Sequence, residues 1–154
     1  MKSPVLRSAL VLGAVLVIAL LAMEMSMKAC LFSATRGVVT RNGAPVANAE
    51  VSRTYNWGWL DSADSDSTRT DAQGRFSFDA VWKRTMMHGV LPLHRSVMQE
   101  IFVRVDGKEY RAWSFSKPNF DDLGEVGRPL ELNCELTEPD KNRQTHWGIA
   151  QLAP

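Results

Sequence analysis

A charge-free apolar run extends from Ser8 to Met23, in front of roughly 120 residues of short alternating segments separated by turn signals. The run lacks the polar face that an amphipathic surface helix would have, and Lys2 and Arg7 give it a positively charged n-region. We therefore expect a signal anchor or signal peptide over residues 1–29, a β domain over residues 30–137 and a polar C-terminal tail over residues 138–154.

The length of the run suits a single membrane helix. As a helix it would cover about 24 Å, which is slightly short of the ~30 Å hydrocarbon core of a bilayer. The segment Pro4–Leu6 can extend it if Arg7 reaches back to the head groups.

The residues that follow the run fit cleavage poorly. Cleavage after Ala29 would put Met27 at position −3, where a signal peptidase needs a small residue. A lipoprotein would begin at Cys30, but Lys28 stands where a small uncharged residue is expected. An uncleaved anchor is favoured, with a secreted protein and a lipoprotein as alternatives.

The charges indicate topology and exclude one class of partner. Basic residues before the run favour a cytoplasmic N-terminus, so we expect a single-pass inner-membrane protein whose domain faces the periplasm. The leader holds three of the 18 basic and one of the 17 acidic residues, which leaves the domain with a net charge near −1. Such a domain has no basic surplus for binding nucleic acid.

Two cysteines remain, Cys30 and Cys134. In an oxidising compartment an even count favours one disulfide. This bridge would close a loop of roughly 100 residues and contribute about 4 kcal/mol in the chain-entropy model. The alternatives are a lipidated Cys30 with a free Cys134, or two free thiols.

Seven segments carry the alternation or composition of short strands. The clearest is Pro129–Thr137, in which every second residue from Leu130 to Leu136 is apolar and Cys134 faces the core. The predicted strands are Leu31–Thr40, Ala49–Tyr55, Ser67–Thr70, Arg75–Phe78, Gln99–Val105, Glu109–Phe115 and Pro129–Thr137.

Turn signals separate these strands. Asn42-Gly43 and Asp106-Gly107 favour tight hairpins, and Gly74 permits a turn before Phe76. Longer loops are expected over Asn56–Asp66, Val81–Val97 and Lys117–Arg128. The pattern predicts an all-β fold, an antiparallel seven-stranded β-sandwich preceded by one N-terminal transmembrane or signal helix.

Part of the domain resembles a known family. The matching stretches are Gly37–Thr40, Asn42–Val51 and Thr68–Phe78, which follow a G-x-V strand, a G-x-P turn with its strand, and a T-D-x-x-G-x-F turn. This pattern is similar to that of the carboxypeptidase regulatory-like family, which has a transthyretin-like (prealbumin-like) sandwich. The resemblance covers roughly Arg36–Phe78 and is specific for the fold, while it implies little about function.

The enzymes associated with this fold are not expected here. In carboxypeptidases the module accompanies a separate zinc peptidase domain with a His-x-x-Glu pair, and His88, His94 and His146 lack that spacing. Transthyretin-like hydroxyisourate hydrolases end in Tyr-Arg-Gly-Ser, whereas this chain ends in Gln151–Pro154.

No catalytic, cofactor-binding or metal-binding residues are predicted. The aspartates Asp61, Asp64, Asp66 and Asp71 do not have calcium-loop spacing, so they indicate a solvated acidic loop. Neither a glycine-rich phosphate loop nor a nucleophile elbow occurs in the sequence.

Aromatic residues supply the one candidate binding surface. Tyr55, Trp57, Trp59 and Asp61 fall in or beside one predicted loop, and exposed aromatics beside polar groups suit partner or sugar binding. The alternative is that the tryptophans cover an open end of the sandwich as core. The surface is expected to include the Val81–Leu93 loop.

We therefore expect a non-catalytic, membrane-anchored envelope protein whose β-sandwich acts as a protein-interaction module. Its partners would be the membrane, through the N-terminal helix, and an unknown envelope protein or glycan. One alternative is a glycan-binding or cell-wall-binding module, and another is an accessory or immunity protein for an exported toxin.

Overall fold

The computed structural model describes residues 13, 27–57, 63–85, 96–136 and 149–153. Strands predominate in these segments, which confirms the all-β class for them. None of the described segments contains a helix with the length and apolar character needed to cross a bilayer. The predicted leader helix lies almost entirely outside the described residues.

The chain divides into two compact units, residues 1–29 with 83–93 and residues 30–82 with 94–154. Of the first unit the structure describes only residue 13 and the outer ends of two strands. The two larger sheets belong to the second unit.

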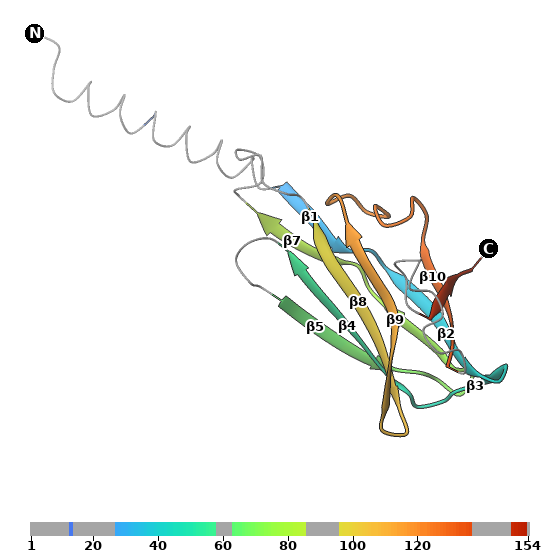
Figure 1. Cartoon of the computed structure of the whole chain (residues 1–154). Helices are drawn as coiled ribbons and strands as arrows, with labels where there is room; N and C mark the ends of the chain where they lie inside the picture. The colour runs from blue at the N-terminus through green and yellow to red at the C-terminus, as the bar shows by residue number, and fades with distance from the viewer. Residues whose placement is uncertain (1–12, 14–26, 58–62, 86–95, 137–148, 154) are drawn as a thin grey trace, which may run out of the picture. The chain divides into compact units, whose positions relative to one another are not determined.

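The described residues form eleven strands in three sheets (Figure 1). β1 pairs with β7, β5-β4-β8-β9 form a four-stranded sheet, and β11-β10-β2-β3 form a five-stranded sheet in which β6 also pairs with β2. The bounds are β1 Met27–Phe32, β2 Thr35–Arg41, β3 Ala44–Pro45, β4 Glu50–Trp57, β5 Ala63–Arg69, β6 Arg75–Phe78, β7 Val81–Thr85, β8 Val97–Val105, β9 Lys108–Lys117, β10 Leu130–Glu135 and β11 Ala150–Leu152.

The five-stranded sheet departs from the predicted antiparallel arrangement. β10 runs parallel to β2, with Leu130 opposite Thr35 and Glu135 opposite Thr40. β6 pairs antiparallel with β2. β2 therefore lies inside its sheet, between β10 and β6, and its backbone is held from both edges.

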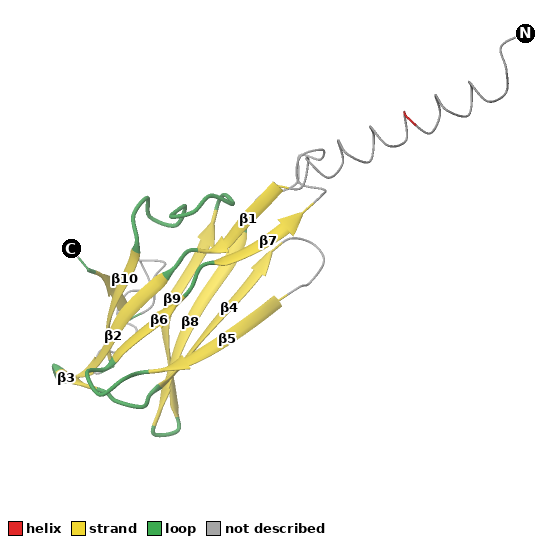
Figure 2. Ribbon diagram, turned by 180° about the vertical axis from the view of Figure 1, so that it is seen from behind, coloured by secondary structure: helices red, strands yellow, loops and turns green. Residues whose placement is uncertain are grey.

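Inner faces of the two larger sheets pack on each other in a sandwich-like arrangement (Figure 2). Val51, Arg53 and Tyr55 are buried along β4. The Arg53 guanidinium lies 4.9 Å from the Phe32 ring centroid and 4.6 Å from the Phe78 ring centroid. It also forms a bidentate ion pair with the Asp66 carboxylate. Arg53 interrupts the apolar pattern of β4 but belongs to the core, because two rings and a carboxylate satisfy its charge.

The predicted turns are confirmed. Asn42 and Gly43 have φ values of 52° and 75°, and Asp106 and Gly107 have φ values of 52° and 71°. These left-handed conformations favour glycine and asparagine, which explains why the sequence signal was reliable. The first turn joins β2 to β3, and the second joins β8 to β9.

Several predicted boundaries were wrong. The segment predicted as one strand over Leu31–Thr40 is two strands, β1 and β2, which belong to different sheets. β5 begins inside the predicted Asn56–Asp66 loop, β7 occupies part of the predicted Val81–Val97 loop, and β11 lies in the predicted tail. The predicted strand Ser67–Thr70 covers only the second half of β5. The first half was missed because its side chains are exposed on both faces, so it shows no apolar alternation.

Gly37 is required by the packing of β2. A Cβ atom at this position would lie 2.4 Å from Cζ of Phe76 and 2.8 Å from the backbone oxygen of Leu132. The ring of Phe76 can therefore pack against the backbone of β2 only because residue 37 has no side chain.

We predict that Gly37→Ala lowers the free energy of unfolding by about 1–3 kcal/mol, because the ring and the β10 backbone must both move. Urea denaturation followed by tryptophan fluorescence measures the change. Ser77→Ala, at an exposed position directly after Phe76, should stay within about 0.5 kcal/mol of the parent chain. Equal stability of the two variants would contradict this description of the sheet.

Candidate functional site

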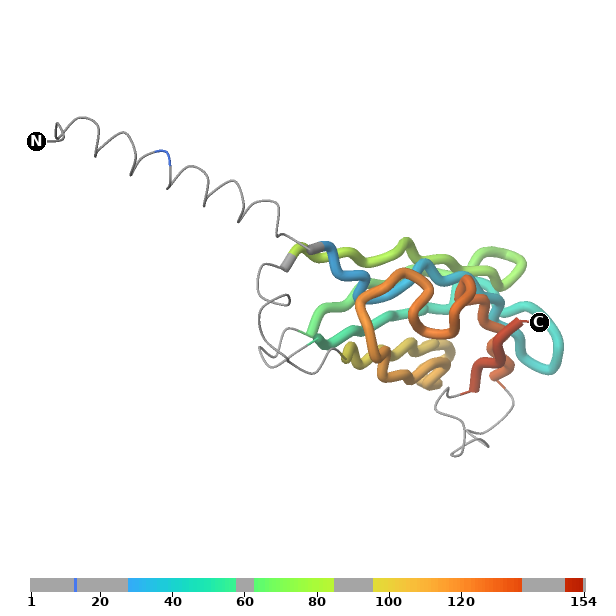
Figure 3. Tube along the Cα trace, turned by 90° about the horizontal axis from the view of Figure 1, so that it is seen from above, coloured from blue at the N-terminus to red at the C-terminus, as the bar shows by residue number. Residues whose placement is uncertain are grey.

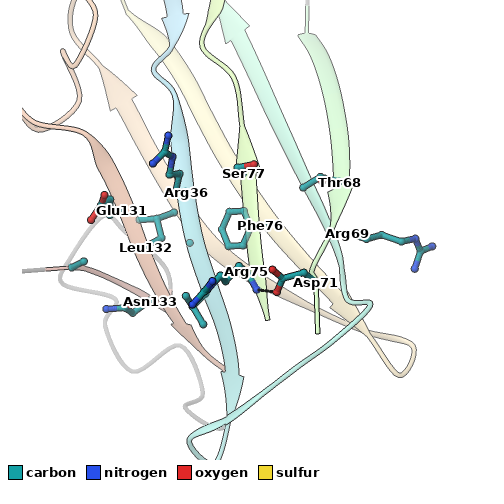
Figure 4. A pocket seen from close by; sticks show the side chains of 13 residues that line it. Arg36, Thr68, Arg69, Asp71, Arg75, Phe76, Ser77, Glu131, Leu132 and Asn133 are labelled. Atoms are coloured by element: carbon teal, nitrogen blue, oxygen red, sulfur yellow. Dashed lines mark hydrogen bonds between the residues drawn. The ribbon is translucent and has the colours of Figure 1, made fainter. Parts of the chain in front are cut away.

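An open groove of about 610 Å3 lies over β2, β6, β10 and the end of β5 (Figure 4). We call it the arginine groove. Its volume falls within the range of small-ligand sites. Its charged and amide side chains are Arg36, Arg69, Asp71, Arg75, Glu131 and Asn133.

The strand register puts two arginines on the outer face of the sheet. Arg36 lies opposite Ser77 on one side and Glu131 on the other, and Val38 lies opposite Arg75. Opposite residues in a ladder share a face, as do residues two apart along a strand. Arg36 and Arg75 therefore project from the same face, and both are exposed.

These two guanidinium groups are available for binding. Within the described part of the chain, neither Arg36 nor Arg75 has a side-chain hydrogen bond or ion pair. Arg69, at the rim, instead donates to the backbone oxygen of Asn48 at 3.1 Å. The Asp71 carboxylate accepts two backbone N–H groups of its own turn, at 2.9 and 2.8 Å.

A second polar cluster is closed to solvent. The Glu125 carboxylate accepts the backbone N–H of Ser33 at 3.0 Å, the Ser33 hydroxyl at 2.6 Å and the Gln99 amide at 2.7 Å. Lys117 Nζ lies 3.2 Å from the same carboxylate. The Lys117 and Glu125 side chains are 0% and 1% exposed, so this is a buried ion pair.

The hydrogen bonds keep Glu125 ionised despite its burial. Burial raises the pKa of Glu125, but the hydrogen bonds from Ser33 and Gln99 and the charge of Lys117 outweigh it. The net effect is a lowered pKa. The cluster therefore joins the 118–129 connection, which contains Glu125, to the end of β1 and to β8 and β9. In Figure 3 this connection is the orange segment that lies beside the blue strands.

This cluster has a structural role. A serine hydroxyl beside a carboxylate could serve as a nucleophile, but Ser33 is 0% exposed. Its hydroxyl also accepts the backbone N–H of Leu123 at 2.8 Å. We therefore assign the cluster to stability, which leaves the arginine groove as the candidate functional site.

The aromatic candidates do not form the predicted surface as far as the structure describes them. Tyr55 is 6% exposed. The pKa of its phenol is raised mainly by burial and secondly by the neighbouring Asp64 carboxylate. The Trp57 ring packs edge-on against Phe120 at 6.3 Å between centroids. Tyr55 is thus a core residue, and Trp57 packs against the 118–129 connection.

The remaining candidates fall on other parts of the chain. Trp59 and Asp61 lie outside the described residues, as do His88, His94 and His146. In the described segments, no group of three histidine, cysteine, aspartate or glutamate side chains is placed to hold a metal.

The predicted disulfide between Cys30 and Cys134 is absent from the structure, which has two buried free thiols. Cys30 Sγ lies 3.8 Å from Ser33 Oγ and 3.8 Å from an Asp122 oxygen. Cys134 lies in β10 opposite Val39, well along β2 from Cys30. The parallel pairing of β10 with β2 explains this, because it sets the two cysteines at different levels of the fold.

The arginine groove could not be predicted from local sequence patterns. Arg36 and Arg75 directly precede Gly37 and Phe76, which pack together, and as exposed strand residues they carry no signal of a site by themselves. Nothing in the sequence indicates that their strands are neighbours. The pairings of β2 with β6 and β10 create the site.

Residues 35–139 match the family described as Domain of unknown function (DUF6795). The chain belongs to this family. No curated protein and no solved structure matches the chain. The DUF6795 match includes Arg36, Arg75 and Glu131, so the charged part of the arginine groove on β2, β6 and β10 lies within the family domain.

We predict that Glu125→Gln lowers the free energy of unfolding by about 3 kcal/mol or more, because it leaves the Lys117 charge buried without a counter-ion. Urea denaturation measures this. Glu131→Gln, at an exposed position, should change stability by less than about 0.5 kcal/mol.

Comparison of the parent chain with Glu125→Gln also tests whether the pKa of Glu125 is lowered, because the direction of the pKa shift determines how stability changes with pH. A lowered folded-state pKa contributes stability that is complete above about pH 5 and is lost as the pH falls through the folded-state value. The stability of the parent chain should therefore fall with pH more steeply than that of Glu125→Gln over this acidic range. Parallel pH profiles would contradict a buried ionised Glu125.

We predict that neither cysteine of the folded chain reacts with maleimide, whereas both react after denaturation. Burial raises the pKa of both thiols, that of Cys134 to about 12, and the thiolate is the reactive form. Intact mass counts the labels, and Ser65→Cys, at an exposed position of β5, provides the positive control. A gel mobility that shifts on reduction would instead show the bridge.

Proposed function

We propose that the protein is a non-catalytic, membrane-anchored envelope protein whose β domain binds a partner protein through the arginine groove. The observation that carries the proposal is the pair of guanidinium groups of Arg36 and Arg75, which lie on the neighbouring strands β2 and β6 and have no partner among the described residues. Groups on paired strands are held more rigidly than groups on loops, which reduces the entropy lost on binding.

Burial of the reactive side chains supports a binding role rather than catalysis. Cys30, Ser33 and Cys134 are each 0% exposed. The exposed polar groups of the groove are arginine, amide, hydroxyl and carboxylate groups without a nucleophile–base pair at hydrogen-bonding distance among the described residues. Such a surface can recognise a partner but has no group prepared for covalent chemistry.

The fold proposed for the domain is the transthyretin-like sandwich of the carboxypeptidase regulatory-like family. The confirmed turns at Asn42-Gly43 and before Phe76 support this finer assignment, as does the packing of two sheets. This assignment requires that the transthyretin-like sandwich has a parallel strand pair equivalent to β2 and β10.

Membrane attachment is proposed through a retained leader, with the domain in the periplasm. The apolar run Ser8–Met23 supports the anchor. Burial of Cys30 weighs against the lipoprotein alternative, because its sulfur is enclosed beside Ser33 and Asp122 and could not carry a diacylglyceryl group in this fold. The backbone N–H of Cys30 also donates to Phe120 inside the domain.

We predict that a photo-reactive benzoylphenylalanine at position 77, inside the arginine groove, crosslinks the full-length protein to a partner in intact host cells. The same substitution at Ser65, on β5 beside the predicted aromatic loop, is the comparison. Arg36→Gln combined with Arg75→Gln should remove most of the adduct at position 77, while the amount of protein and its unfolding temperature stay unchanged.

Two outcomes would contradict the proposal. Adducts at position 65 alone would transfer the binding surface to the aromatic loop around Trp59. Adducts at position 77 that survive loss of both arginines would show that the groove is adjacent to a partner without recognising it.

A further inference from the structure

We propose that the arginine groove binds an extended acidic segment of a polypeptide, in which two carboxylates are separated by one residue. This inference rests on the proposed function, because it specifies the partner chemistry of the same groove. It is carried by the register of Arg36 and Arg75 and by the side chains around them.

The two arginines are diagonal neighbours on adjacent antiparallel strands. Arg75 lies directly opposite Val38, and Val38 is two residues beyond Arg36 on β2. Diagonal positions of this kind lie about 7–8 Å apart. Between them, the half-buried Val38 offers a small apolar contact, and the exposed Ser77 offers a hydroxyl.

An extended peptide reproduces that distance. It rises about 3.4 Å per residue, so side chains two residues apart share a face and are separated by about 7 Å. A Glu-x-Glu segment therefore presents one carboxylate to each guanidinium. Arginine suits this role because its planar donors bind a carboxylate at two points.

The other lining residues disfavour two further classes of ligand. A stacked sugar needs an exposed aromatic face, but the aromatic ring of the groove, Phe76, is 5% exposed and packs on Gly37. A dense polyphosphate would meet the exposed carboxylate of Glu131, directly opposite Arg36. A peptide with spaced carboxylates can place a neutral residue or a lysine beside Glu131.

The test is fluorescence anisotropy with the full-length protein in detergent micelles. The probe is a labelled peptide of alternating glutamate and serine, and the comparison peptides carry glutamine in place of glutamate or the same glutamates as adjacent pairs. Arg36→Gln and Arg75→Gln should each weaken binding about threefold to tenfold, as loss of a partly exposed ion pair would. Glu131→Gln should strengthen binding.

Arg104→Gln is the matched control. It removes one positive charge from the same domain, but Arg104 is in the four-stranded sheet and is ion-paired with Glu109. It should leave the affinity unchanged. Added salt should weaken binding to the parent chain more than to either groove variant, because fewer charges are paired in the variants.

Each of the other outcomes overturns the inference. Equal losses in Arg104→Gln and the groove variants would show attraction by net charge alone. Tighter binding of an oligogalacturonate than of the peptide, through the same arginines, would assign the groove to an acidic glycan. Failure of the peptide to bind would exclude this ligand class, while an arginine-dependent crosslink at position 77 would still support the interaction surface.

Discussion

The buried ion pair between Lys117 and Glu125 is the interaction on which the described fold depends most. Its carboxylate is held by Ser33 and Gln99 as well as by the lysine, so one side chain joins three separate parts of the chain. Removal of a single partner would leave a buried charge uncompensated, which is costly in a protein interior. Ser33 lies just before β2, and this position links the cluster to the strand that carries Arg36.

Much of the fold could be predicted from local patterns. The hairpin at Asp106-Gly107 and the alternation of β10 are encoded by turn chemistry and by apolar residues at every second position. The division of the first strand at Ser33 could not be predicted, because it depends on a carboxylate 92 residues further along the chain. The first half of β5 was missed because its exposed side chains carry no strand signal, and its pairing with β4 determines its structure.

The candidate site was less predictable than the fold. Tyr55 and Trp57 were predicted to lie on a binding surface because aromatic residues often mark such surfaces, but Tyr55 is in the core and Trp57 packs on Phe120. Arg36 and Arg75 are unremarkable as single residues in the sequence. They form a site only because β6 pairs with β2, and pairing between strands is a long-range property that a local pattern does not specify.

Hydrogen exchange in Glu125→Gln and the parent chain tests most directly whether the buried cluster holds the strand that carries the groove. The amides of Ser33 and Leu123 donate into the cluster, and the amide of Val39 lies in β2 and bonds to Gly74. We expect all three amides to lose protection together in the variant. Loss confined to residues 118–129, with Val39 still protected, would show that the cluster stabilises only its own connection and would contradict the link to the arginine groove.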